Sequence, residues 1–124
     1  MRLKKINFTL LLVLVSMFSV VKAKESNGTI EFKGRWCGEW DDKFQTCFTI
    51  DKHDGYFSAF YEWEEFIGGG FQKKTIRGKR LNDNTLDFKG KILIFNLKNP
   101  DQAVAMGIFR HHSRVAELKR QTSN

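Results

Sequence analysis

The chain is predicted to be an all-β protein: about eight short antiparallel strands forming an up-and-down meander barrel. Three observations predict this class. Strand-like runs and turn signals alternate at a spacing of roughly ten residues from residue 34 onward. Tight turns join consecutive runs, which favours pairing in sequence order. One face of the first strands is strongly aromatic, and closure into a barrel encloses such a face while removing exposed edges. A β-sandwich is the structural alternative.

The first predicted element is a hairpin over residues 34–51, GRWCGEWDDKFQTCFTID. Trp40 and Phe44 flank a three-residue turn, and pairing them sets every other pair by counting outward. Cys37 then falls opposite Cys47. Because strand side chains alternate in facing, one face is polar and carries both cysteines. The other face is apolar and carries Trp36, Gly38, Trp40, Phe44, Thr46, Phe48 and Ile50.

The two cysteines are the only ones in the chain. In an exported chain they indicate one disulfide, Cys37–Cys47, on the outer face of the hairpin. Two thiolates without neighbouring ligands do not close a tetrahedral metal site. No basic partner lies at a spacing that indicates a catalytic thiol.

A second hairpin follows, because Asp54-Gly55 is a tight-turn signal between two alternating runs. Pairing His53 with Tyr56 continues the apolar face through Phe57, Ala59, Tyr61 and Trp63. Residues 64–70 form a predicted loop with three glycines, and further strands are expected over residues 71–80, 86–90, 92–97, 103–110 and 114–120. Short helices are the alternative for the last two, since Asp101 is a suitable cap and helix formers follow it.

The N-terminal residues have the pattern of a secretory signal peptide. Charged residues at the start precede an apolar run over residues 10–21 and the small-residue cleavage pattern Val21-Lys22-Ala23. The sequence therefore predicts a cleaved segment, 1–23, and a single domain, 24–124. We expect the product to be secreted or periplasmic, with no stable membrane span after cleavage.

The charge of the predicted domain is a mild positive bias. The whole chain carries +7, and removing the four basic residues of 1–23 leaves about +3, which does not indicate nucleic-acid binding. Basic residues do cluster at Lys73, Lys74, Arg77, Lys79 and Arg80. A solvated strand face is the preferred interpretation, and an anionic-ligand patch is the alternative.

No catalytic constellation is evident, so the chain is predicted not to be an enzyme and to use no cofactor or metal. The acidic pairs Asp41-Asp42 and Glu64-Glu65 lie in predicted loops, and His111-His112 lies at a predicted turn. No serine lies in a nucleophile elbow. The glycines of residues 68–70 lack the lysine and the strand–helix context of a phosphate loop.

The sequence resembles the calycin superfamily of lipocalin-like and avidin-like barrels. The resemblance rests on Gly34-Arg35-Trp36 at the first strand and on Arg120 at the end of the last. In such barrels an arginine of the closing strand typically covers the tryptophan, which implies that Arg120 packs on Trp36, with Arg114 as the substitute. The chain is shorter than a typical lipocalin, and the biotin-binding residues of avidins cannot be traced in it.

The aromatic inner face is the best candidate for a site. A barrel of eight strands is either filled by side chains or leaves room for one small ligand. The predicted ligand-binding residues are Trp40, Phe44, Phe48, Tyr61 and Trp63. The predicted function is non-catalytic binding of a small or medium apolar or aromatic ligand in the barrel or at its mouth. The alternative is a protein-interaction module, a protease inhibitor or an envelope or host-interaction factor, that uses loops and outer strands.

A homodimer is also predicted, from the strands near the C-terminus. Residues 92–97 are apolar on both faces, and the next strand carries Val104, Met106 and Ile108 alternating with further apolar residues. A barrel wall needs only one apolar face, so some of these side chains point outward and form a patch.

Overall fold

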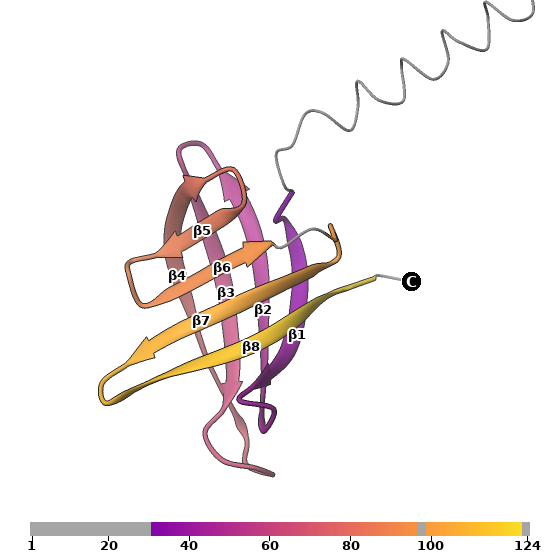
Figure 1. The fold of residues 1–124 in the computed structure, drawn as a ribbon, viewed down its shortest axis with the longest axis vertical. Helices are drawn as coiled ribbons and strands as arrows, with labels where there is room; N and C mark the ends of the chain where they lie inside the picture. The colour runs from indigo at the N-terminus through magenta and orange to yellow at the C-terminus, as the bar shows by residue number, and fades with distance from the viewer. Residues whose placement is uncertain (1–30, 97–98, 123–124) are drawn as a thin grey trace, which may run out of the picture.

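The computed structural model describes residues 31–96 and 99–122, which form a closed antiparallel barrel in the order β1 to β8 (Figure 1). The predicted signal peptide, residues 1–23, lies outside the described residues. The eight strands are β1 (Gly34–Trp40), β2 (Phe44–His53), β3 (Tyr56–Glu64), β4 (Phe71–Asn82), β5 (Thr85–Phe88), β6 (Ile92–Asn96), β7 (Gln102–Phe109) and β8 (His112–Gln121). The predicted all-β up-and-down barrel is therefore confirmed. In the described ranges, no helix has the length and apolar character needed to cross a membrane.

The first three strands pair in the predicted register. Trp40 lies opposite Phe44 and Cys37 opposite Cys47, while His53 lies opposite Tyr56 across the next turn. The turn after β1 has positive φ angles at its two aspartates, a conformation that aspartate tolerates better than most residues. Cys37 and Cys47 form the predicted disulfide, with their Cα atoms 4.1 Å apart, as in a non-hydrogen-bonded cross-strand pair.

The last two strands settle the choice between strand and helix that the sequence left open. β7 pairs with β8 over its whole length, from Gln102 opposite Lys119 to Phe109 opposite His112. β8 in turn pairs with β1, which closes the barrel. Gly38 permits a close approach there, because a Cβ atom on it would overlap the carbonyl oxygen of Glu117.

One end of the barrel is closed by a tryptophan beneath an arginine, as the resemblance implied. The guanidinium carbon of Arg120 lies 4.2 Å from the ring centroid of Trp36, which is fully buried. The Trp36 indole donates a hydrogen bond to the carbonyl of Phe32 at 2.8 Å. Arg120 donates to the carbonyls of Glu31 and Lys33, and its Nε lies 3.3 Å from a carboxylate oxygen of Asp101. The residues before β1, the turn before β7 and the end of β8 are thus held together.

The outer face of β6, β7 and β8 carries the apolar patch that the sequence predicted. Ala103, Ala105 and Ile94 point into the core, so the alternate positions Val104, Met106 and Ile108 point outward. Met106 pairs with Leu93 on one side and with Val115 on the other. Met106, Ile108 and Val115 are 38%, 56% and 46% exposed, so the patch is in contact with solvent.

Candidate functional site

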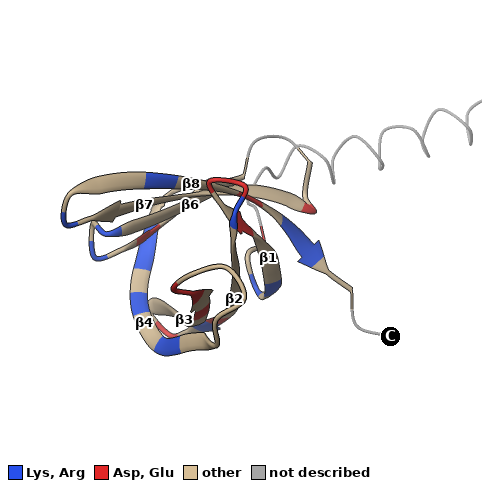
Figure 2. Cartoon of the chain, turned by 90° about the horizontal axis from the view of Figure 1, so that it is seen from below, with Lys and Arg blue, Asp and Glu red and all other residues tan. Residues whose placement is uncertain are grey.

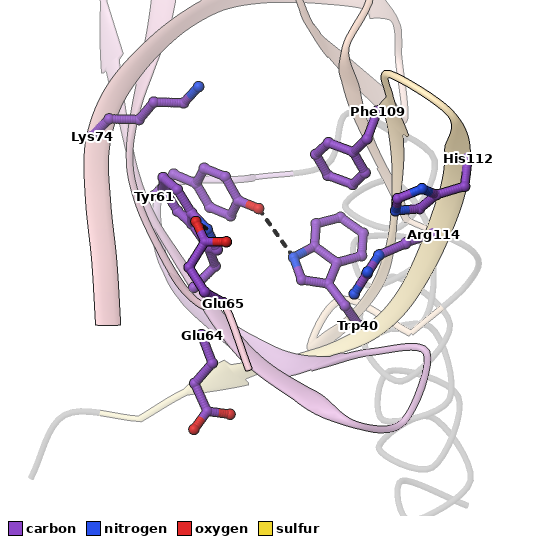
Figure 3. Close-up of a pocket in the computed structure, with 9 residues that line it drawn as sticks. Trp40, Tyr61, Glu64, Glu65, Lys74, Phe109, His112 and Arg114 are labelled. Carbon is purple, nitrogen blue, oxygen red and sulfur yellow. Dashed lines mark hydrogen bonds between the residues drawn. The ribbon is translucent and has the colours of Figure 1, made fainter. Parts of the chain in front are cut away.

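The end of the barrel opposite Trp36 contains a cavity of about 360 Å³ (Figure 3). It lies where β1, β3, β4, β7 and β8 reach the rim. Its lining comprises Trp40, Tyr61, Trp63, Glu64, Glu65, Lys74, Phe109, His112 and Arg114. The volume is within the range of pockets that bind small molecules.

The floor of the cavity is aromatic and rigidly packed. The indole of Trp40 donates a hydrogen bond to the hydroxyl of Tyr61 at 3.1 Å, the contact drawn as a dashed line in Figure 3. The Tyr61 ring stacks on Trp63, with centroids 4.6 Å apart. Phe109 meets Trp40 edge to face at 5.7 Å. Offset-stacked and edge-to-face contacts of this kind are the favoured geometries of aromatic pairs, so the floor is pre-formed.

Tyr61 is neutral at ordinary pH. Burial raises the pKa of Tyr61 to about 12, and its hydrogen bonds with Trp40 and Thr46 only partly offset this. Its hydroxyl oxygen accepts the indole N–H of Trp40, and Thr46, its other hydrogen-bond partner, donates its own hydroxyl proton to the carbonyl of Glu62. The floor therefore presents one neutral hydrogen-bonding group within an apolar surface.

The rim of the cavity is charged, with cations on β4 and β8 and carboxylates at the end of β3. The guanidinium carbon of Arg114 lies 4.7 Å from the Phe44 ring centroid and 3.8 Å separates its Nε from a carboxylate oxygen of Asp41. The Lys74 ammonium lies 5.8 Å from the Trp63 ring centroid. Glu64 points away from the aromatic floor (Figure 3) and accepts the backbone N–H of Gln45.

Three of the five predicted ligand-binding residues line this cavity: Trp40, Tyr61 and Trp63. Phe48 instead is a fully buried core residue that stacks on Tyr61 from below, with ring centroids 4.7 Å apart. Phe44 is partly buried and packs against the core beneath Arg114, and it does not line the cavity. Both therefore support the floor without forming it.

Six lining residues were not predicted as site residues: Glu64, Glu65, Lys74, Phe109, His112 and Arg114. Lys74 points inward because it lies opposite Tyr61, whereas the neighbouring Lys73 lies opposite the outward Glu62. The basic cluster on β4 is thus divided between the two faces of the wall. In the sequence, only the alternation of Lys74, Ile76 and Gly78 indicates that Lys74 faces inward, and this signal is weak.

The arrangement is suited to binding. The described residues include no group of three or more histidine, cysteine, aspartate or glutamate side chains that could hold a metal ion. The carboxylates at the rim have hydrogen-bond partners: Glu65 accepts the indole N–H of Trp63 at 3.2 Å. What the cavity offers a ligand is aromatic surface, one neutral hydroxyl and a rim that carries both signs of charge.

Comparisons with known proteins gave no match to a family model, to a curated protein or to a solved structure.

Proposed function

We propose that this protein is an exported, non-catalytic binding protein that takes a small ligand with an aromatic or apolar body at the open mouth of the barrel. The observation that carries the proposal is the cavity above the stacked rings of Tyr61 and Trp63, at one end of the barrel. Most ligand sites combine a mainly apolar lining with a few placed polar groups, and the Tyr61 hydroxyl and the rim charges are such groups.

Two further observations support this function. The resemblance to the calycin superfamily places small-ligand binding among its expected activities, and the Trp36–Arg120 contact that it implied is present. A disulfide is typical of oxidising compartments, which supports the proposed secreted or periplasmic location.

Native mass spectrometry of the protein purified from its own host tests the proposal. We expect a retained small molecule that dissociates on activation in the gas phase. Trp63→Ala and Phe109→Ala remove floor residues and should lower its occupancy. Phe60→Ala is the matched control, because Phe60 is an aromatic residue on the outer face of β3, 41% exposed. Equal occupancy in all three variants, or no retained molecule in the unsubstituted protein, would contradict the proposal.

Protein interaction remains the second candidate function, and one observation favours it. The outward apolar side chains of β6, β7 and β8 form a contiguous exposed patch, and large patches of this kind commonly mark interaction surfaces. A protease inhibitor or an envelope or host-interaction factor would use such a surface while the cavity stayed empty.

A further inference from the structure

The wall of the barrel is incomplete beside β4. This strand has 12 residues, whereas β5 has 4, and the pairing between the two strands includes only Lys79, Arg80 and Asn82 of β4. Residues 71–77 pair with β3 along one edge. In the part of the chain that the structure describes, no strand pairs with their other edge. We call this opening the wall gap.

The wall gap begins where β4 separates from β5. A Cβ atom on Gly78 would overlap the carbonyl oxygen of Asp87, so the two strands are in close contact at that point. Beyond it lies a cavity of about 870 Å³. Lys74, Thr75, Ile76 and Arg77 of β4 form one side, and residues 88–92 and 108–110 form the other. The free edge of β4 therefore faces a hollow large enough to receive part of another chain.

The free edge carries backbone groups that can pair with another strand. In an antiparallel ladder, every second residue of an edge strand directs its N–H and C=O away from its neighbour. Outside the strand ladders, the backbone hydrogen bonds of the described residues include none from residues 71–77. An edge of this kind is a template for strand addition, in which main-chain hydrogen bonds supply affinity and side-chain contacts supply specificity.

The lining of the wall gap is basic as well as apolar. It contains five cationic side chains and no carboxylate: Lys74, Arg77, Lys89, Lys91 and Arg110. Figure 2 shows basic segments both along β4 and at the turns that face it. The ion pairs of the described residues join Arg35 to Glu62, Arg114 to Asp41 and Arg120 to Asp101, and none of them neutralises this lining. Apolar contacts are available from Ile76, Phe88, Ile92 and Phe109.

The charge identifies the kind of strand that fits. Lysines on an edge strand oppose pairing between identical edges, because like charges would be brought together. A second copy of this chain is therefore disfavoured at the wall gap, whereas an acidic segment is attracted to it. We propose that the wall gap is a docking site for an extended acidic segment of a partner protein, which pairs with residues 71–77 as an added strand.

This site is separate from the proposed small-ligand function. It uses the backbone edge of β4 and the turns after β5 and β7, where Lys89, Lys91 and Arg110 lie outside the lining of the ligand cavity. The two hollows share only Tyr61, Lys74 and Phe109. Lys89 and Lys91 line only the larger hollow, so substitutions there test the partner strand without altering the lining of the ligand cavity.

Amide hydrogen exchange on the purified protein, read residue by residue by NMR, tests the proposal. In the free protein, alternate amides of residues 71–77 should exchange faster than those bonded to β3. A synthetic peptide as long as this segment, alternating valine and glutamate, should slow these alternate amides at least about tenfold at saturation. A peptide alternating valine and lysine is the charge control. The acidic peptide with alternate backbone amides methylated is the strand-pairing control.

A pair of charge variants locates the site. The double variant Lys89→Glu, Lys91→Glu should weaken binding of the acidic peptide by at least about tenfold. Lys52→Glu with Lys119→Glu makes the same charge change at exposed positions away from the gap and should have little effect. Circular dichroism confirms that both variants are folded. Equal binding of the valine–lysine or the methylated peptide, no protection by any peptide, or full protection of residues 71–77 before peptide is added would each overturn the proposal.

Discussion

The two ends of the barrel use similar residues in different ways. At the closed end, Arg120 covers Trp36 and has three carbonyl partners from two segments of the chain: Glu31 and Lys33 before β1, and Pro100 before β7. At the open end, Arg114 covers Phe44 and has one distant carboxylate partner. The side chains of the two arginines are similarly exposed, 21% for Arg120 and 27% for Arg114. The contrast therefore lies in their partners rather than in their access to water.

This contrast indicates that the two ends of the barrel have different roles. Hydrogen bonds to a charged donor that is partly desolvated contribute more than exposed ion pairs do. At the closed end, Arg120 joins the residues before β1, the turn before β7 and the end of β8. The cavity lies at the other end of the barrel. The comparison predicts that substitutions at the closed end act on stability, whereas those at the open end act on binding.

The largest effect is expected from Arg120→Met. This change removes the cation–π contact with Trp36 and leaves the carbonyls of Glu31 and Lys33 without their donor. We expect a loss of about 2–4 kcal/mol in the free energy of unfolding, measured by urea denaturation. Arg114→Met is the matched control, with an expected loss below about 1 kcal/mol. Equal losses in the two variants would remove the proposed difference between the ends.

A smaller effect is expected from Gly38→Ala. The added methyl group would overlap the carbonyl oxygen of Glu117 and force β1 away from β8. We expect a loss of about 1–3 kcal/mol in the free energy of unfolding. Gly70→Ala, in the loop before β4, is the control, since no atom lies within 4 Å of its Cβ position. An unchanged denaturation midpoint for Gly38→Ala would mean that the seam between β1 and β8 relaxes freely.

The pH dependence of stability tests whether Tyr61 is buried in the floor of the cavity. The pKa of Tyr61 is raised from 10.0 to about 12 by burial, so the folded chain keeps a proton that the unfolded chain releases between these values. The contribution of Tyr61 is therefore fully present below pH 10.0 and is lost as the pH rises to about 12. Tyr61→Phe should flatten this part of the stability profile.

The titration itself can be observed directly. The chain has two tyrosines, so the tyrosinate absorbance of a Tyr56→Phe variant reports on Tyr61 alone. Ionisation of Tyr61 near its ordinary pKa in the folded variant would contradict the burial argument.

The smallest effect on stability is expected from Met106→Lys on the outer apolar patch. Exposed substitutions of this kind change the free energy of unfolding by about 0.5 kcal/mol or less. The sequence-based expectation of a homodimer nevertheless gives this variant a distinct outcome: sedimentation should change from dimer to monomer. Thr49→Lys, at an exposed position on β2, should leave the sedimentation unchanged. A monomer at micromolar concentration in the unsubstituted protein would leave the patch to another partner.

The first three strands could be predicted residue by residue because several independent signals agree there. The three-residue turn, the Asp54-Gly55 turn, the cysteine pair and the aromatic alternation all require one register, and a shift by one residue would reverse every side chain. The Arg120–Trp36 contact was predictable from the resemblance, because it follows once the first and last strands are neighbours.

The rest of the site could not be predicted from the sequence, for physical reasons. The inward facing of Phe109, His112 and Arg114 depends on the register across a long turn that contains Pro100, and one residue more or less would change it. The wall gap arises from the unequal lengths of β4 and β5, and strand ends are poorly encoded in local patterns. Phe48 was placed on the correct face, yet only its depth shows that it belongs to the core.

The pairing of β1 with β8 also has a consequence for how the chain folds. Every other neighbouring pair joins strands that are consecutive in sequence, so seven of the eight strand pairs can form through local contacts. The pairing of β1 with β8 must bring Trp36 to Arg120. Its formation costs the loop-closure entropy of nearly the whole domain. Because Arg120 contacts Glu31 and Lys33, the two ends of the folded domain lie close together. A circular permutant that links them converts this seam into a local hairpin and transfers the slow, long-range step to whichever turn is cut.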